Sequence, residues 1–286
     1  MILITDSGST KCDWIAIDDA GKTLFEKIRT KGLNPAILPE KKLNRIISKS
    51  KELMQFKSEV THVFFYGAGC GTDNPREMLS NVLQEIFVNA KIDVQEDTMA
   101  AVRATLNHSD EAAVVCIMGT GSNCSYYDGK NLHQRVKSLG YSLMDDASGN
   151  RYGKMLIRDY YFNKMPNTIK LAFEHKYNLD ADFIKYNLYK QANPNAYLAK
   201  FAEFMFLNKD SEYIQKVIKR GFRIFTENMI MQYAEELKTV PVHFAGSIAY
   251  FSQNEIKEVA EEFGFKVGNF VRRPIDGLVE YHIKNL

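Results

Sequence analysis

Two short segments of the chain place glycine and hydroxyl side chains directly after an apolar run. The first follows residues 2–5 and begins with Asp6, and the second follows residues 114–118. Their small and polar residues are Ser7, Gly8, Ser9, Thr10 and Lys11 in the first segment, and Gly119, Thr120, Gly121 and Ser122 in the second. A turn of this composition exposes backbone N–H groups and hydroxyls, and glycine lets the backbone come close to a phosphate.

The second segment repeats the pattern of the first. Gly8 and Ser9 correspond to Gly121 and Ser122, and in both copies a second apolar run and a turn containing Asp and Gly follow. A single turn of this kind is also typical of an ordinary β-hairpin. Because the pattern occurs twice in the same strand context, we interpret the two turns as binding elements for the polyphosphate of ATP.

Two charged residues border the first turn. A carboxylate beside a phosphate turn requires a cation, so Asp6 is the expected ligand of Mg²⁺, either directly or through water. Lys11 follows the turn directly and would place a positive charge near the phosphates, although a solvated surface lysine is the alternative.

Composition excludes several classes of function. Thirty-seven basic and 35 acidic residues give a formal net charge of +2, so we expect neither a nucleic-acid nor a membrane partner. The cysteines at positions 12, 70, 116 and 124 lack metal-ligand spacing, which favours a reduced, cytoplasmic protein. No charged leader precedes the first apolar run, and no apolar run reaches membrane-spanning length.

The order of the expected elements restarts at the second turn. Residues 1–106 predict strands at 2–5, 12–17 and 23–28, a helix at 39–56, a strand at 60–66, a helix at 75–88, a strand at 92–95 and a helix at 97–106. The remainder predicts a strand meander from 114, helices over 148–237, a strand at 242–245, a helix at 248–263, a strand at 265–267 and a terminal helix after 274. We therefore expect an α/β protein made of two related lobes with a cleft between them.

With these motifs in this order, the chain resembles the actin and sugar-kinase superfamily, specifically the N-acetylglucosamine kinase-like branch related to the BadF/BadG/BcrA/BcrD ATPases. Residues 6–11 resemble the first phosphate loop and residues 119–123 the second. Residues 244–248 are similar to the adenosine motif, which implies nucleotide contacts from Gly246 and Ser247. The resemblance implies a two-lobed actin-like, ribonuclease H-like duplicated fold with an interlobe cleft. Its N-terminal lobe would comprise residues 1–106 and 274–286, and its C-terminal lobe residues 107–273 with a helical insertion.

The resemblance also implies a sugar site. Residues 96–101 resemble the segment that carries the catalytic aspartate, which would be Asp97, although an N-cap role for this residue is equally compatible with its position before a helix. Residues 32–35 resemble the loop whose asparagine contacts the sugar. The full set of implied substrate contacts is Asn34, Gly69, Asp97, Thr120, Tyr141 and Asp145.

One motif departs from the family pattern. Residues 139–149 occupy the place where the family has Gly-Asp-Glu-Gly-Ser-Gly after a glycine and an aromatic residue. Asp145 keeps the aspartate, but Met144 and Ala147 replace glycines and Asp146 replaces the glutamate. The loss of two glycines restricts the backbone, so this segment bears on which sugar is accepted.

The function that the resemblance implies is ATP-dependent phosphorylation of an amino sugar, most simply N-acetylglucosamine to its 6-phosphate, with ATP and Mg²⁺ as cofactors. We expect a homodimer, with the aromatic-rich helices between residues 160 and 233 as core or subunit interface. Two alternatives remain open. One is an ATPase activator of a 2-hydroxyacyl-CoA dehydratase, which holds an iron–sulfur cluster through cysteines, and the other is a catalytically impaired sugar or nucleotide sensor.

Overall fold

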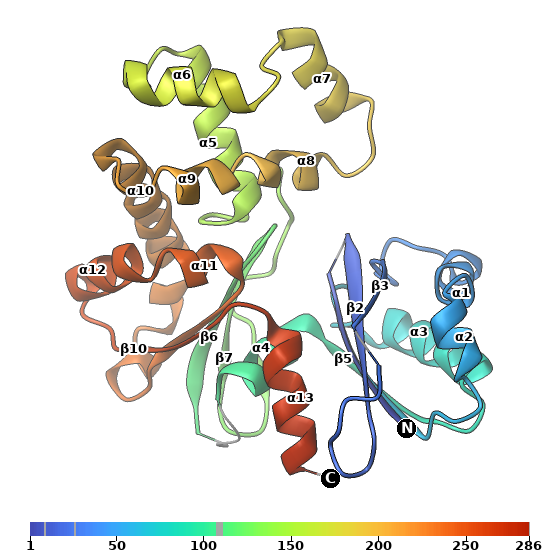
Figure 1. Ribbon diagram of the computed structural model, residues 1–286. Coiled ribbons are helices and arrows are strands. Elements are labelled where there is room, and N and C mark those ends of the chain that lie inside the picture. The colour runs from blue at the N-terminus through green and yellow to red at the C-terminus, as the bar shows by residue number, and fades with distance from the viewer. Residues whose placement is uncertain (9, 26, 107–110, 286) are drawn as a thin grey trace. The chain divides into compact units, whose positions relative to one another are not determined.

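The structure is a computed structural model that describes residues 1–8, 10–25, 27–106 and 111–285 (Figure 1). The chain divides into two compact units, of which unit 1 comprises Met1–Ser109 and Arg273–Leu286 and unit 2 comprises Asp110–Arg272. The predicted start of the second lobe, at residue 107, lies outside the described residues. Each unit contains one five-stranded sheet that mixes parallel and antiparallel pairs.

The sheet of unit 1 has the strand order β3-β2-β1-β4-β5. Its strands are β1 (Ile2–Ser7), β2 (Lys11–Ile17), β3 (Ile28–Lys31), β4 (His62–Gly67) and β5 (Lys91–Glu96). Its helices are α1 (Glu40–Ser48), α2 (Lys51–Gln55), α3 (Asp73–Ile86), α4 (Asp97–Thr105) and α13 (Pro274–Lys284). The predicted element order of the first 106 residues is confirmed except that two helices, α1 and α2, stand where one was predicted.

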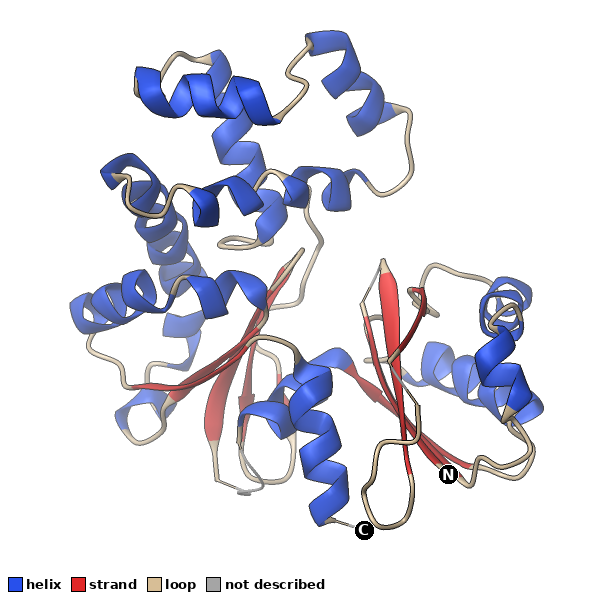
Figure 2. Cartoon of the chain, in the orientation of Figure 1, coloured by secondary structure: helices blue, strands red, loops and turns tan. Residues whose placement is uncertain are grey.

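Both faces of this sheet are covered by helices (Figure 2). Because successive strand residues point to opposite faces, Leu3 packs in a core with residues of α1 and α3, whereas Ile2 and Ile4 pack with residues of α4 and α13. The α13 helix comes from the end of the chain, so the C-terminus completes the unit that the N-terminus begins.

Three parallel strands of unit 1 end at the same level. Ser7 of β1 pairs with Gly67 of β4, and Gly67 pairs with Glu96 of β5. The residues that follow these strands therefore meet at one edge of the sheet, where open α/β sheets bind their ligands.

The sheet of unit 2 has the order β10-β9-β6-β7-β8. Its strands are β6 (Ala113–Met118), β7 (Ser122–Tyr127), β8 (Leu132–His133), β9 (Val242–Ala245) and β10 (Val267–Val271). It repeats the plan of unit 1, because β6 pairs with β7 as an antiparallel hairpin and with β9 in parallel, as β1 does with β2 and β4. The predicted duplication is confirmed.

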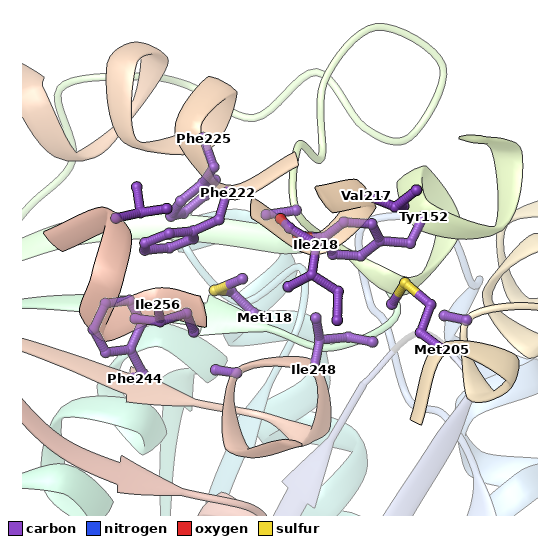
Figure 3. Close-up of a cluster of buried hydrophobic side chains, with 14 of the residues drawn as sticks. Met118, Tyr152, Met205, Val217, Ile218, Phe222, Phe225, Phe244, Ile248 and Ile256 are labelled. Atoms are coloured by element: carbon purple, nitrogen blue, oxygen red, sulfur yellow. The ribbon is translucent and has the colours of Figure 1, made fainter. Parts of the chain in front are cut away.

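Most of unit 2 is helical. Its helices are α5 (Gly149–Tyr161), α6 (Asn167–Lys176), α7 (Ala181–Tyr189), α8 (Pro194–Lys200), α9 (Glu203–Leu207), α10 (Glu212–Asn228), α11 (Ser247–Phe251) and α12 (Gln253–Phe263), with 3₁₀ turns η1 (Ile230–Tyr233) and η2 (Glu236–Lys238). Figure 3 shows the core that joins the sheet to these helices, where Phe222 of α10 contacts both Phe244 of β9 and Phe225 of its own helix. Much of the aromatic content of the helical region is therefore core, and the homodimer stays a prediction.

Several predicted boundaries are wrong. The third strand is not at 23–28 but at Ile28–Lys31, and Thr23 forms only an isolated bridge with Ile17. The helix predicted at 39–56 is two helices, because Ser50 begins α2 by accepting a hydrogen bond from the Leu53 N–H. The helix predicted at 248–263 is likewise divided, at Ser252.

The strand predicted at 265–267 instead spans Val267–Val271. Its pairing with β9 in the sheet extends it past the apolar run that marked it in the sequence.

Among the helices of the described residues, none combines the length and apolar character needed to cross a membrane.

Candidate active site

Two carboxylates lie at the edge of unit 1 where the parallel strands end. Asp6 is the next-to-last residue of β1, and Asp97 directly follows β5. Burial raises the pKa of Asp6 to about 7, helped by the negative charges of Asp97 and Asp13, while Lys11 acts in the opposite direction. A divalent cation beside Asp6 would relieve this repulsion, so the chemistry of this edge fits a metal ion.

Asp97 lies one residue further into helix α4 than predicted. Glu96 occupies the N-cap position of α4 and makes no side-chain cap hydrogen bond, and Asp97 is the first helical residue. Burial raises the pKa of Asp97 to about 6, with the Glu96 charge adding to the effect and the backbone N–H groups of Thr98 and Asp97 opposing it. The prediction that Asp97 is the N-cap is therefore wrong, and a catalytic role for its carboxyl group stays a prediction.

The first predicted phosphate turn is a tight hairpin. The Gly8 N–H donates to the Lys11 carbonyl oxygen at 2.9 Å, and a Cβ atom at Gly8 would meet no other atom within 4 Å. Gly8 therefore leaves open space beside the backbone. Thr10 is exposed, and Ser9 lies outside the described residues.

Ser7 and Lys11 have protein partners of their own. The buried Ser7 Oγ accepts a hydrogen bond from the Leu33 N–H at 2.9 Å, which attaches the segment around Asn34 to the end of β1. The Lys11 Nζ lies 3.7 Å from an Asp13 carboxylate oxygen. Direct phosphate contacts of these two side chains stay predictions.

Unit 1 brings Asn34, Gly69 and Asp97 to the same edge. Gly69 has φ +84°, and a Cβ atom there would lie 2.0 Å from Asn34 Oδ1, so only glycine allows this approach. Two residues later, a Cβ atom at Gly71 would lie 2.9 Å from Glu96 Oε2. The loop after β4 thus lies between the asparagine loop and the residue that precedes Asp97.

Hydrogen bonds from the first residues of α5 stabilise the second predicted phosphate turn. The Gly149 N–H donates to the Gly119 carbonyl at 2.8 Å, and Asn150 donates to the Thr120 carbonyl from its backbone N–H at 3.1 Å and from Nδ2 at 2.7 Å. Sequence reasoning did not single out Asn150, although it directly follows the Ser148-Gly149 pair of a recognised motif.

Asp145 contacts the same turn. Its Oδ2 accepts a hydrogen bond from Asn150 Nδ2 at 2.9 Å, and its carboxylate also accepts one from the Ser122 backbone N–H. Burial raises the pKa of Asp145, and these hydrogen bonds oppose the shift. Tyr141 lies in the same segment, and its carbonyl oxygen accepts from Lys154 Nζ at 3.3 Å. Asp145 therefore stabilises the second turn through its hydrogen bonds with Ser122 and Asn150. The substrate contacts of Thr120, Tyr141 and Asp145 stay predictions.

The altered motif keeps a glycine-like backbone without the glycine. Ala147 has φ +56° and Asp145 has φ +65°, both in the left-handed region that disfavours residues with a Cβ atom. Ala147 thus takes a conformation that glycine adopts more readily, at a cost of about 1–2 kcal/mol.

The glycines at the strand ends of unit 2 differ in why they are needed. Gly246 has φ +113°, and a Cβ atom there would lie 2.3 Å from the Met118 carbonyl oxygen, so the protein itself requires glycine. A Cβ atom at Gly119 would meet nothing within 4 Å, and its backbone is not in the left-handed region. Neither packing nor backbone conformation requires glycine at position 119, so a phosphate contact there stays a prediction. Ser247, the first residue of α11, is exposed.

Comparisons with known proteins agree with this geometry. A sequence model described as the BadF/BadG/BcrA/BcrD ATPase family matches residues 5–264. A proposed N-acetylglucosamine kinase from Porphyromonas gingivalis is 32% identical, with a TM-score of 0.91 over 100% of this chain and 99% of that chain. No curated protein sequence matches the chain.

Two more distant structures share the fold. A proposed N-acetylglucosamine kinase from Chromobacterium violaceum is 12% identical, with a TM-score of 0.71 over 98% of each chain. A ROK family glucokinase from Streptomyces griseus, in complex with glucose and AMPPNP, is 11% identical, with a TM-score of 0.58 over 98% of this chain and 97% of that chain. The predicted α/β, duplicated, actin-like fold is confirmed.

The Asp6 carboxyl group should make the metal-free protein less stable at alkaline pH. Its folded pKa of about 7 is above the unfolded value of about 3.9, so its contribution to stability is complete below pH 4 and is lost as pH rises through 7. We expect Asp6→Asn to raise the free energy of unfolding by about 1–3 kcal/mol at pH 8 in EDTA and to have little effect at pH 4. Urea unfolding at both pH values measures this, with exposed Asp19→Asn as the control. Equal effects at the two pH values would contradict it.

The backbone of Ala147 should make this position tolerant of glycine. Ala147 and Ala202 are both buried, but Ala202 has φ −65°. Replacement by glycine removes a methyl group and adds chain entropy at both sites, so the difference between them isolates the left-handed conformation. We expect Ala202→Gly to lower the free energy of unfolding by about 1–2 kcal/mol more than Ala147→Gly does. Equal losses in denaturant titrations would show that residue 147 is not left-handed in solution.

Proposed function

Because the chain belongs to the BadF/BadG/BcrA/BcrD ATPase family, we propose that it is a sugar kinase that transfers the γ-phosphoryl group of ATP to a hydroxyl group of an amino sugar. The proposed acceptor is the 6-hydroxyl of N-acetylglucosamine. The observation that carries this proposal is the pair of carboxyl groups at the strand edge of unit 1, Asp6 and Asp97, whose pKa values are raised to about 7 and about 6.

Asp97 would accept the proton of the attacking hydroxyl group. With a pKa of about 6 it is mostly ionised at neutral pH, yet it is a stronger base than an ordinary aspartate. Kinases use an aspartate in this role, because the hydroxyl proton must leave as the new bond to phosphorus forms.

Asp6 would hold Mg²⁺. Among the described residues no group of three or more His, Cys, Asp or Glu side chains forms a complete metal cage. Mg²⁺ commonly binds through one or two carboxylates, with waters and substrate phosphates completing the shell, so a single aspartate is sufficient here. When bound, the ion would neutralise charge on the phosphate oxygens of ATP.

Each unit supplies residues for the nucleotide or the sugar. In unit 2 the turn at Gly119, Thr120 and Gly121 would bind phosphates, and Gly246 with Ser247 would approach the nucleoside. In unit 1 the hairpin at Gly8 would approach phosphate, and Asn34 with Gly69 would contact the sugar beside Asp97. The contacts of Asn34 with Gly69 support this assignment.

The alternatives have less support. A cluster-binding activator would need cysteines accessible to a shared iron–sulfur cluster, but Cys12, Cys70, Cys116 and Cys124 are all buried. Cys116 and Cys124 face each other on neighbouring strands, with 3.5 Å between their sulfurs. A sensor that has lost catalysis would not need Asp97, nor Ala147 in a glycine-like conformation.

Asp97→Asn should remove the proton acceptor without unfolding the protein. We expect kcat to fall about 10²–10⁴-fold in an ADP-release assay, while the stabilisation of the protein by Mg-ATP in thermal melts is retained. The matched control is Glu96→Gln, which removes a charge that raises the pKa of Asp97. Its kcat should persist, and the acidic limb of its kcat/KM profile, near pH 6 in the wild type, should move to lower pH. A turnover of Asp97→Asn within a few-fold of the wild type would rule out this mechanism.

Asn34→Ala should affect the sugar more than the nucleotide. A buried polar contact that is removed leaves its substrate partner unpaired, so the sugar KM should rise about tenfold or more and the ATP KM should change little. Asn44→Ala, at a half-buried position of α1, is the control. Initial rates over a panel of N-acetylglucosamine, glucosamine and glucose also identify the acceptor. Equal increases in both KM values would remove Asn34 from the sugar site.

A further inference from the structure

Unit 1 has a second hollow, at the opposite edge of its sheet from β5. A pocket of 560 Å³ lies between the edge strand β3, helix α1 and the start of α2. Its charged lining residues are Arg29, Lys31, Lys42, Arg45, Lys49 and Glu52. Five cations and one carboxylate face one hollow, in a chain whose formal net charge is only +2.

The cations are placed there by the geometry of two elements. Lys42, Arg45 and Lys49 are spaced at i, i+3 and i+7, so they share one face of α1 and its C-cap. The other face of α1 carries the buried Leu43 and Ile47 and packs into the core. The helix is therefore held rigidly with its basic face toward β3.

Most of this charge has no anionic partner among the residues that the structure describes. Arg29 forms two hydrogen bonds with Asp13, from Nε at 2.6 Å and from Nη2 at 3.2 Å. Among the described residues, no carboxylate oxygen lies within 4.0 Å of a charged nitrogen of Lys31, Lys42, Arg45 or Lys49. Like charges around a hollow repel one another, and an anion bound within it would relieve that repulsion.

We propose that this pocket binds a small phosphorylated metabolite, with its phosphate dianion between the cations of β3 and α1. The volume falls within the range of small-molecule sites, about 300–1,000 Å³. Arginine and lysine side chains together are the usual ligands of a phosphate group, and a phosphomonoester carries about 1.5–2 negative charges at pH 7. The half-buried Ile46 gives the pocket an apolar side for the rest of the molecule. The site is independent of the proposed kinase reaction.

Two contacts connect the pocket to the hairpin of the first phosphate turn. Arg29 shares the Asp13 carboxylate with Lys11, which ends that turn. Thr30, which also lines the pocket, accepts a hydrogen bond at Oγ1 from the indole N–H of Trp14 at 3.1 Å. Trp14 is the only tryptophan in the chain and is fully buried, so its fluorescence reports on the strand that lines the pocket.

The test is a fluorescence titration of the whole protein with N-acetylglucosamine 6-phosphate, glucose 6-phosphate and inorganic phosphate in separate arms. We expect a saturable change in Trp14 emission with half-saturation below about 1 mM for at least one sugar phosphate. A response to inorganic phosphate of equal affinity would identify free phosphate as the ligand. The absence of a saturable change in all three arms would overturn the proposal.

Matched charge reversals locate the response. Lys42→Glu/Lys49→Glu changes two exposed pocket residues, and Lys41→Glu/Lys51→Glu makes the same charge change on neighbouring residues that do not line the pocket. We expect the first variant to raise the half-saturating concentration about tenfold or more and the second to change it less than about twofold at about 0.1 M salt. Lys31→Glu, on β3, repeats the test on a different element. The proposal would be overturned if both double variants raised the half-saturating concentration equally. It would also be overturned if Lys11→Gln abolished the Trp14 response while the pocket variants kept it.

Discussion

Burial of the Asp6 and Asp97 carboxyl groups is the constraint on the strand edge of unit 1. Both lie where parallel strands end. Burial raises the pKa of Asp6 to about 7, with the Asp97 charge adding to the shift, and burial raises the pKa of Asp97 to about 6, with the Glu96 charge adding to it. Lys11 opposes the shift at Asp6, but its ammonium group lies within ion-pair distance of Asp13 rather than being fully available. The edge therefore keeps one carboxyl group that favours a cation and one that can exchange a proton. A phosphoryl transfer to a hydroxyl group uses both properties.

The second predicted phosphate turn, in unit 2, consists mainly of backbone groups rather than charged side chains. The turn is closed by a hydrogen bond from the Gly119 N–H to the Gly121 carbonyl oxygen, and Gly149 and Asn150 donate to the carbonyl oxygens of Gly119 and Thr120. Asp145 adds a carboxylate that accepts from Ser122 and Asn150. The left-handed conformation of Ala147 belongs to the same arrangement, since it lets the chain pass from Asp145 into α5. Strain retained at such a position is typical of a functional segment.

Local patterns predicted most of the fold. The two hairpins, the helices of unit 1 and the strand Val242–Ala245 depend on periodicity and turn residues that lie close together in the chain. Two errors have different origins: the third strand depends on pairing between distant residues, whereas the division of the helix predicted at 39–56 depends on a local cap. Residues 23–28 are apolar enough for a strand, yet β3 forms at Ile28–Lys31, because its register is set by pairing of Trp14 with Ile28 and of Asp13 with Arg29. Ser50 divides the helix predicted at 39–56 by capping α2.

The sequence alone determined the two glycine and hydroxyl turns and the order of elements around them. It also placed Asp97 at the start of a helix, to within one residue. Each of these follows from residues adjacent in the chain. Only the tertiary structure decided the chemistry of those residues. The raised pKa values of Asp6 and Asp97 require desolvation by elements far apart in sequence, and the role of Asn150 requires α5 to meet the second turn. The basic pocket likewise exists only because α1 and β3 pack side by side, since the free energy of a charge depends on what surrounds it in space.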